Sequence, residues 1–279
     1  MKLFFVSLVI CAFHNIYGCE AIWNKGPSEL LMNIFKVLEV DSVSDLAAAK
    51  ELSHKKMKRP KDKERWDNYQ TVTDLQKEKL KLILFNSALT IRVTPSKNVY
   101  DAVTVFGATL SRVKNRLNYF VELMNNGLVF KTVYLLGSDR DLRSGNLEDQ
   151  IYSNQLVQKG INPTEMQMMI CVWEDMKEKH SALKEVRVIF VEARKKRDGN
   201  RPGTIDTLEA MVKLAQDTKG KSFLFVSNNP YIAYQDAVCK QFFKNHGAIV
   251  ETVGDAASEN ESIENILDSV AMTLYNIAE

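Results

Sequence analysis

The stretch DAVTVFGATLSRVKNRLNYF, residues 101–120, changes character at one glycine. The residues before Gly107 are apolar and β-branched, as in a strand that is buried on both faces. The residues after it have helical periodicity and include Arg112, Lys114 and Arg116. A buried strand that leads through a small-residue turn directly into a helix is the beginning of a βαβ unit, which is typical of parallel sheets.

The same alternation of strand and helix continues to the end of the chain. Apolar, β-rich runs occupy residues 102–106, 132–136, 186–191, 223–226 and 248–253. Helical patterns follow them at residues 110–126, 164–179, 204–219, 231–245 and 258–277. These five repeats predict an α/β fold, a Rossmann-like three-layer sandwich with a mostly parallel five-stranded sheet.

A small helical segment is predicted to precede this fold. Residues 22–95 contain three helical runs and form a candidate helical subdomain, whereas residues 98–279 form the α/β domain. The strongly basic segment 54–65, HKKMKRPKDKER, lies between two of these runs. A run of this kind is typical of a solvated helix end and loop, and the alternative is attraction to an anionic membrane surface.

The N-terminus has the pattern of a signal peptide over residues 1–18. A short basic start is followed by LFFVSLVICAF, which is shorter than the roughly 20 apolar residues that a membrane-spanning helix needs. Residues 16–19 resemble a bacterial lipoprotein processing site, although Tyr17 is bulky for such a site. Cys19 is therefore a candidate for lipidation, and a simple cut near Ala21 is the alternative. Either outcome predicts an exported protein, periplasmic or anchored to the membrane of the cell envelope.

Composition and motifs exclude several classes of function. The 279 residues include 37 basic and 35 acidic side chains, a balance that does not predict binding to nucleic acid. The sequence contains no P-loop motif, no glycine-rich dinucleotide fingerprint and no cysteine–histidine spacing typical of metal sites. A divalent cation between two glutamates is conceivable, but without an Asp-rich cluster we predict no metal.

Ligands of open parallel sheets bind beyond the carboxyl ends of the strands, so the turns after the strands hold the candidate site. After the first strand, Gly107, Thr109, Arg112 and Arg116 predict a seat for a phosphate or another anion, because helix N-termini and arginines bind anions. The later turns contribute further candidates to ligand binding, namely Gly137, Ser138, Thr204, Thr207, Ser227, Asn228, Tyr231 and Gln235.

Two carboxylates in these turns are the candidate catalytic residues. Glu192 directly follows the third strand, and Glu165 opens a helix, where capping alone would also explain it. Both could bind hydroxyl or amine groups or act as acid and base.

In their order, these motifs resemble the YdcF-like (SanA/ElyC/YdcF) domain family over residues 99–255. Gly107 with Arg112 or Arg116 matches the first motif of the family, Gly137-Ser138 the second, Glu165 the third, Glu192 with Thr204 and Thr207 the fourth, and Ser227 the fifth. The chain departs from the family pattern where Tyr231 and Gln235 replace a histidine and an arginine. The resemblance implies a Rossmann-like sandwich beside a helical subdomain and a nucleotide-like ligand such as S-adenosylmethionine.

The expected function is therefore that of an envelope-associated protein that binds a phosphorylated or nucleotide-like small molecule, with or without catalysis. The alternative is a non-catalytic envelope factor that docks a partner protein or the head group of a lipid carrier. The lack of a catalytic histidine and of a nucleophile elbow favours this alternative.

Overall fold

The computed structural model describes residues 18–277 apart from 41, 68, 86 and 195–201. The predicted signal peptide therefore lies outside the described residues, except for Gly18. Five parallel strands form one sheet in the order β3-β2-β1-β4-β5. They are β1 (Ala102–Phe106), β2 (Thr132–Ser138), β3 (Val188–Ala193), β4 (Ser222–Asn228) and β5 (Ile249–Asp255). The predicted fold class is confirmed, and each predicted strand is present within a few residues of its expected position.

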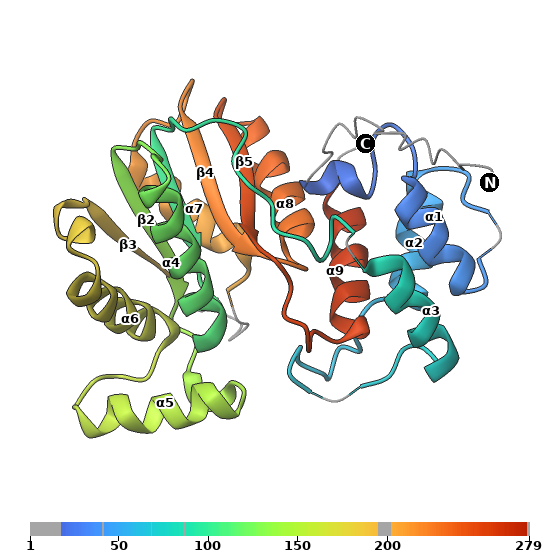
Figure 1. Cartoon of the computed structure of the whole chain (residues 1–279), viewed down its shortest axis with the longest axis horizontal. Helices are drawn as coiled ribbons and strands as arrows, with labels where there is room; N and C mark the ends of the chain where they lie inside the picture. The colour runs from blue at the N-terminus through green and yellow to red at the C-terminus, as the bar shows by residue number, and fades with distance from the viewer. Residues whose placement is uncertain (1–17, 41, 68, 86, 195–201, 278–279) are drawn as a thin grey trace, which may run out of the picture.

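Two pairs of helices cover the two faces of the sheet (Figure 1). Helices α4 (Leu110–Asn125) and α6 (Glu165–Lys179) pack against one face, where they bury Val103 and Val105 of β1. Helices α7 (Thr204–Ala215) and α8 (Ile232–Lys244) pack against the other face, on which the rings of Phe106 and Phe225 stack at 5.4 Å. All five residues of β1 are buried, because this central strand has a helix layer on each side.

The helical N-terminal segment packs on the last helix of the chain (Figure 1). After the short 3₁₀ turn η1 (Gly18–Ala21) it contains α1 (Glu29–Val37), α2 (Leu46–Lys56) and α3 (Asp74–Leu84). Apolar side chains of all three helices share one buried cluster with α9 (Ile263–Asn276). The basic loop between α2 and α3 is thereby placed next to the carboxyl edge of the sheet.

One helix has no counterpart among the predicted elements. Helix α5 (Leu147–Gln158) lies between β2 and α6 and follows the short 3₁₀ turn η2 (Leu142–Ser144). A second 3₁₀ turn, η3 (Ser181–Glu185), connects α6 to β3. Its apolar residues Leu147 and Ile151 are exposed, so they give no core-facing stripe from which a helix could be predicted. Within the part of the chain that the structure describes, no helix combines the length and apolar character needed to cross a membrane.

Candidate functional site

The candidate site lies at the carboxyl edge of the sheet, between β1 and β4. The chain leaves β1 toward β2 on one side, whereas β4 leads to β5 on the other, so this is the topological switch point of the fold. Helices α4 and α8 both begin at this edge. Ligands of open α/β sheets bind at such points, which makes the side chains between these two strands the first to consider.

Arg116 of α4 connects the ends of the two central strands. Its Nε donates to Oδ1 of Asn228 at 2.9 Å, and its Nη1 donates to the carbonyl oxygens of Phe106 and Gly107 at 3.0 and 2.8 Å. The residue is only 2% exposed, and burial, together with the neighbouring Arg112, lowers its pKa to about 9. Arg116 therefore ties β1 to β4, and no carboxylate of the described residues forms an ion pair with its positive charge.

Gly107 is required at the end of β1 by close packing. A Cβ atom at this position would lie 2.7 Å from the carbonyl oxygen of Leu136 and 3.1 Å from the carboxyl carbon of Glu165. The glycine therefore lets the neighbouring strand and the carboxylate approach the turn, which is a structural reason for it beside the predicted contact with a ligand.

Tyr231 lies between two guanidinium groups. The guanidinium carbon of Arg112 is 4.4 Å from the centroid of the tyrosine ring, and that of Arg65 is 4.6 Å from it. Nη2 of Arg112 also contacts both carboxylate oxygens of Glu261, at 3.0 and 3.1 Å. The hydroxyl of Tyr231 is buried without a hydrogen-bond partner among the described residues, and burial raises its pKa. Such stacking holds both arginines over an aromatic face in a weakly hydrated setting.

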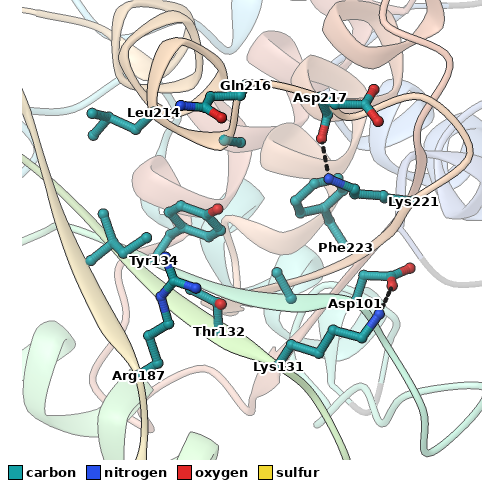
Figure 2. Close-up of a pocket in the computed structure, with 13 residues that line it drawn as sticks. Asp101, Lys131, Thr132, Tyr134, Arg187, Leu214, Gln216, Asp217, Lys221 and Phe223 are labelled. Atoms are coloured by element: carbon teal, nitrogen blue, oxygen red, sulfur yellow. Dashed lines mark hydrogen bonds and ion pairs between the residues drawn. The ribbon is translucent and has the colours of Figure 1, made fainter.

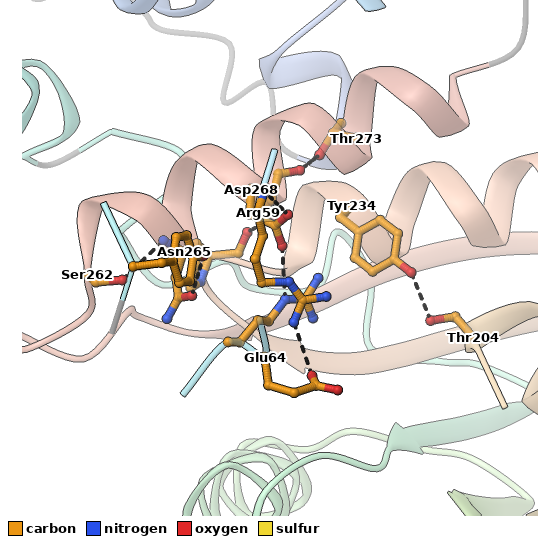
Figure 3. Close-up of polar contacts among 12 residues, drawn as sticks. Arg59, Glu64, Thr204, Tyr234, Ser262, Asn265, Asp268 and Thr273 are labelled. Atoms are coloured by element: carbon orange, nitrogen blue, oxygen red, sulfur yellow. Dashed lines mark hydrogen bonds and ion pairs between the residues drawn. The ribbon is translucent and has the colours of Figure 1, made fainter. Parts of the chain in front are cut away.

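Arg65 reaches this position because the basic loop is attached to α9 (Figure 3). The backbone N–H of Arg59 donates to one oxygen of Asp268 at 3.2 Å, and Nε of Arg65 donates to the other oxygen at 3.2 Å. Arg59 also pairs with Glu64 at 3.1 Å. In the sequence Arg65 is only one cation of the basic segment 54–65, because nothing local indicates that Asp268 brings it to the sheet.

A fourth arginine, Arg140, approaches the same turn from the other side. Its Nη1 pairs with Asp149 at 3.1 Å, and its Nη2 donates to the carbonyl oxygen of Ala108 at 3.1 Å and lies 3.6 Å from Oε1 of Glu165. Its Nε is buried without a partner among the described residues. Together, Arg65, Arg112, Arg116 and Arg140 are called the arginine cluster below.

The chain's own carboxylates occupy the start of α4. Oδ1 of Asp149 accepts the backbone N–H of Leu110 at 2.8 Å, and Glu148 accepts that of Ser111 at 3.2 Å. Thr109 stands at the N-cap position but makes no capping hydrogen bond with its side chain. An anion does lie at this helix start, as the sequence pattern suggests, but it is the side chain of Asp149 from α5.

The two candidate catalytic carboxylates lie in different surroundings. Glu165 is 6% exposed and accepts a hydrogen bond from the hydroxyl of Ser138 at 2.5 Å. Glu192 is exposed on the edge strand β3, in register with Gly137. No contact joins the two glutamates within the described residues.

Gly137 has a packing role, because a Cβ there would lie 2.9 Å from Met166.

The remaining candidates bind mainly to one another. The hydroxyl of Ser227 donates to Oε1 of Gln235, and both residues are buried. The hydroxyl of Thr204 lies 3.3 Å from that of Tyr234 (Figure 3), and the hydroxyl of Thr207 donates to the backbone oxygen of Thr204 at 2.7 Å. These contacts join α7 to α8 and β4 to α8, so these side chains hold the elements at the edge of the sheet together.

Cys19 packs against α8, away from the arginine cluster. Its backbone N–H donates to Asp236 at 3.0 Å, and Lys240 pairs with the same carboxylate at 3.0 Å. Burial raises the pKa of the Cys19 thiol to about 12. Among the described residues, no group of three or more metal-binding side chains lies together.

No family model matches the sequence, and no curated protein matches it. The resemblance to the YdcF-like family remains a prediction that rests on the order of its motifs.

Proposed function

We propose that the protein binds a small phosphorylated or nucleotide-like anion at the carboxyl edge of the sheet, beside the arginine cluster. The observation that carries this proposal is the convergence of four guanidinium groups from three segments of the chain. Arg65 and Arg112 share the ring of Tyr231, while Arg116 and Arg140 bind the neighbouring carbonyl oxygens of Gly107 and Ala108. Arginine forks suit phosphate and carboxylate groups, and partial burial strengthens that attraction.

The pairing of these arginines indicates which of them would meet the ligand. Carboxylates already pair with three of them, since Asp268 contacts Arg65, Glu261 contacts Arg112 and Asp149 contacts Arg140. Arg116 has only neutral partners, and its Nη2 makes no hydrogen bond to the described residues. An anion that reached this nitrogen would relieve the cost of a buried unpaired charge. Arg116 is therefore the proposed centre of anion binding.

A non-catalytic role at the same site is the second candidate. The three described histidines lie elsewhere, with His54 beside Lys58, His180 at the end of α6 and His246 stacked on Phe242. Of the two candidate carboxylates, Glu192 is exposed on the edge strand β3, and Glu165 is already bound by Ser138. These observations support a docking factor of the cell envelope, the alternative that the sequence left open.

A ligand panel measured by thermal shift tests the binding proposal. Inorganic phosphate, pyrophosphate, ATP and S-adenosylmethionine are added separately to the full chain at millimolar concentration. A ligand at one hundred times its Kd stabilises the folded state by about 2.7 kcal/mol, which corresponds to a rise in Tm of about 5–11 °C. The proposal fails if none of the three anions raises the Tm.

Two variants give this experiment its specificity. Arg116→Lys keeps the positive charge but removes the Nη2 that the described residues leave without a hydrogen bond, so it should reduce the ligand-induced rise in Tm. Lys114→Ala, an exposed site on the same helix, is the matched control and should respond like wild type. Mass spectrometry of the stabilising compound then separates the two candidates: conversion that Glu165→Gln abolishes supports an enzyme, whereas an unchanged compound supports docking alone.

A further inference from the structure

A separate cavity of about 380 Å³ lies at the opposite, amino-terminal edge of the sheet (Figure 2). Its wall is formed by the first residues of β1 and β2, by Tyr134 and Phe223, and by the end of α7 at Leu214 and Gln216. The volume is within the range of sites for small molecules, and the lining combines an apolar floor with charged side chains of both signs. None of these residues belongs to the arginine cluster.

The floor of the cavity is aromatic. Ala102, Tyr134 and Phe223 belong to one apolar cluster on the face of the sheet that α7 and α8 cover. In the sheet register, Ala102 of the central strand lies opposite Phe223 of β4. On its other side Ala102 lies opposite Thr132 of β2, so the central strand contributes only a methyl group to the floor beside Phe223.

Cations stand around the opening of the cavity. Figure 2 shows Lys131, Arg187 and Lys221 entering from different segments around Tyr134 and Phe223. Lys131 pairs with Asp101 at 3.0 Å, and Lys221 donates to the backbone oxygen of Asp217 at 2.5 Å.

Arg187 differs from these two lysines. Its backbone oxygen accepts the N–H of Val133 at 2.9 Å, but its exposed side chain makes no ion pair or hydrogen bond within the described part of the chain. The opening therefore retains one guanidinium that is available to an anion.

The roof of the cavity contains a strained residue. Gln216 follows α7 with φ of 61° and ψ of −52°, a left-handed backbone that favours glycine. Its side-chain amide lies over the cavity in Figure 2. Strained positions of this kind persist where the surroundings fix them, and they are frequent at ligand sites. A glycine would relieve the strain but would remove the amide from the roof.

From these features we infer that the cavity binds a small aromatic anion. The ring of the ligand packs between Tyr134 and Phe223, and its single carboxylate or phosphate group binds Arg187. The amide of Gln216 closes over the ring from the end of α7. This site lies at the other edge of the sheet from the anion site proposed above, so the two proposals stand independently.

Ligand-observed fluorine NMR tests this inference with two probes, 4-fluorophenylacetate and 4-fluorophenyl phosphate. Wild-type protein should broaden the signal of at least one probe at millimolar concentration, and the probe that responds identifies the preferred anionic group. Arg187→Gln should weaken binding by about tenfold or more, because it removes a charged hydrogen bond. Ala215→Trp, which fills the cavity, should abolish binding.

Two controls locate the binding. Lys184→Gln changes an exposed cation on the same side of β3 and should leave the affinity unchanged. Arg116→Lys should also bind the probes normally, even if it no longer binds anions at the carboxyl edge. Circular dichroism verifies that Ala215→Trp is folded, and if it is not, Arg187→Gln decides alone. The inference is overturned if wild type broadens neither probe, or if Arg187→Gln binds as tightly as wild type.

Discussion

Removal of the Asp149 side chain is the most direct test of how the carboxyl edge is built. This carboxylate is fully buried, accepts the backbone N–H of Leu110 at 2.8 Å and pairs with Nη1 of Arg140 at 3.1 Å. In Asp149→Ala the first turn of α4 loses its buried anion. The guanidinium of Arg140, whose side chain is 5% exposed, keeps the carbonyl oxygen of Ala108 at 3.1 Å but has only Glu165, at 3.6 Å, as a carboxylate neighbour among the described residues.

The expected loss of stability is large. Breaking a buried ion pair by removing one partner costs about 3–5 kcal/mol, because the other charge stays buried without compensation. For a chain of this size each kcal/mol lowers Tm by about 2–4 °C, so the variant should melt about 6–20 °C below wild type. Urea denaturation followed by circular dichroism measures the free energy of unfolding independently of Tm.

Glu148→Ala is the matched control for this measurement. Glu148 accepts the neighbouring backbone N–H of Ser111 at 3.2 Å, but this hydrogen bond is exposed to solvent. Its loss should cost less than about 1 kcal/mol. Formate should raise the Tm of Asp149→Ala and leave that of wild type unchanged, because it restores an anion at the start of α4. If Asp149→Ala is as stable as Glu148→Ala, the proposed role of the buried carboxylate is refuted.

Three further predictions concern other parts of the chain. The pKa of Asp101 is lowered to about 2, chiefly by the backbone N–H of Ser222, so its contribution to stability is present at neutral pH and is lost as pH falls from about 4 to 2. Urea titrations should therefore show wild type more stable than Asp101→Asn by about 1 kcal/mol at neutral pH, and equally stable at the acid end. Gly107→Ala should lower the free energy of unfolding by about 1–3 kcal/mol, because the new Cβ atom clashes with the backbone oxygen of Leu136. Gly26→Ala is the control and should change this free energy little, because a Cβ atom there meets nothing within 4 Å. Equal effects of the two variants in chemical denaturation would contradict the predicted clash. Burial raises the thiol pKa of Cys239 well above its ordinary value, so iodoacetamide should label this thiol slowly in the native protein and rapidly after unfolding, as measured by peptide mass spectrometry. Prompt labelling of Cys239 in the native protein would be inconsistent with its buried position.

The sheet could be predicted because its signal is local. Each strand is a short apolar run that ends at a small or polar residue, and β1 is buried along its whole length. Parallel topology then brings the ends of all strands to one edge, which is why Arg116 and Asn228 were expected near each other and are joined at 2.9 Å. Helix α5 was missed because Leu147 and Ile151 point to solvent and do not mark a buried face.

The partners of the charged side chains were decided by the tertiary structure. Asp149 occupies the start of α4, where the sequence pattern predicts an external anion. Asp268 lies 203 positions from Arg65 in the chain, and its hydrogen bond holds Arg65 beside Tyr231. The sequence by itself determined the alternation of strands and helices, because hydrophobic periodicity is a property of neighbouring residues. Whether an arginine is paired or left for a ligand depends on whether a carboxylate oxygen lies within about 3 Å of its guanidinium nitrogens, and such partners come from distant parts of the chain. Only the packing of α5 against α4 and of α9 against α8 settles that question.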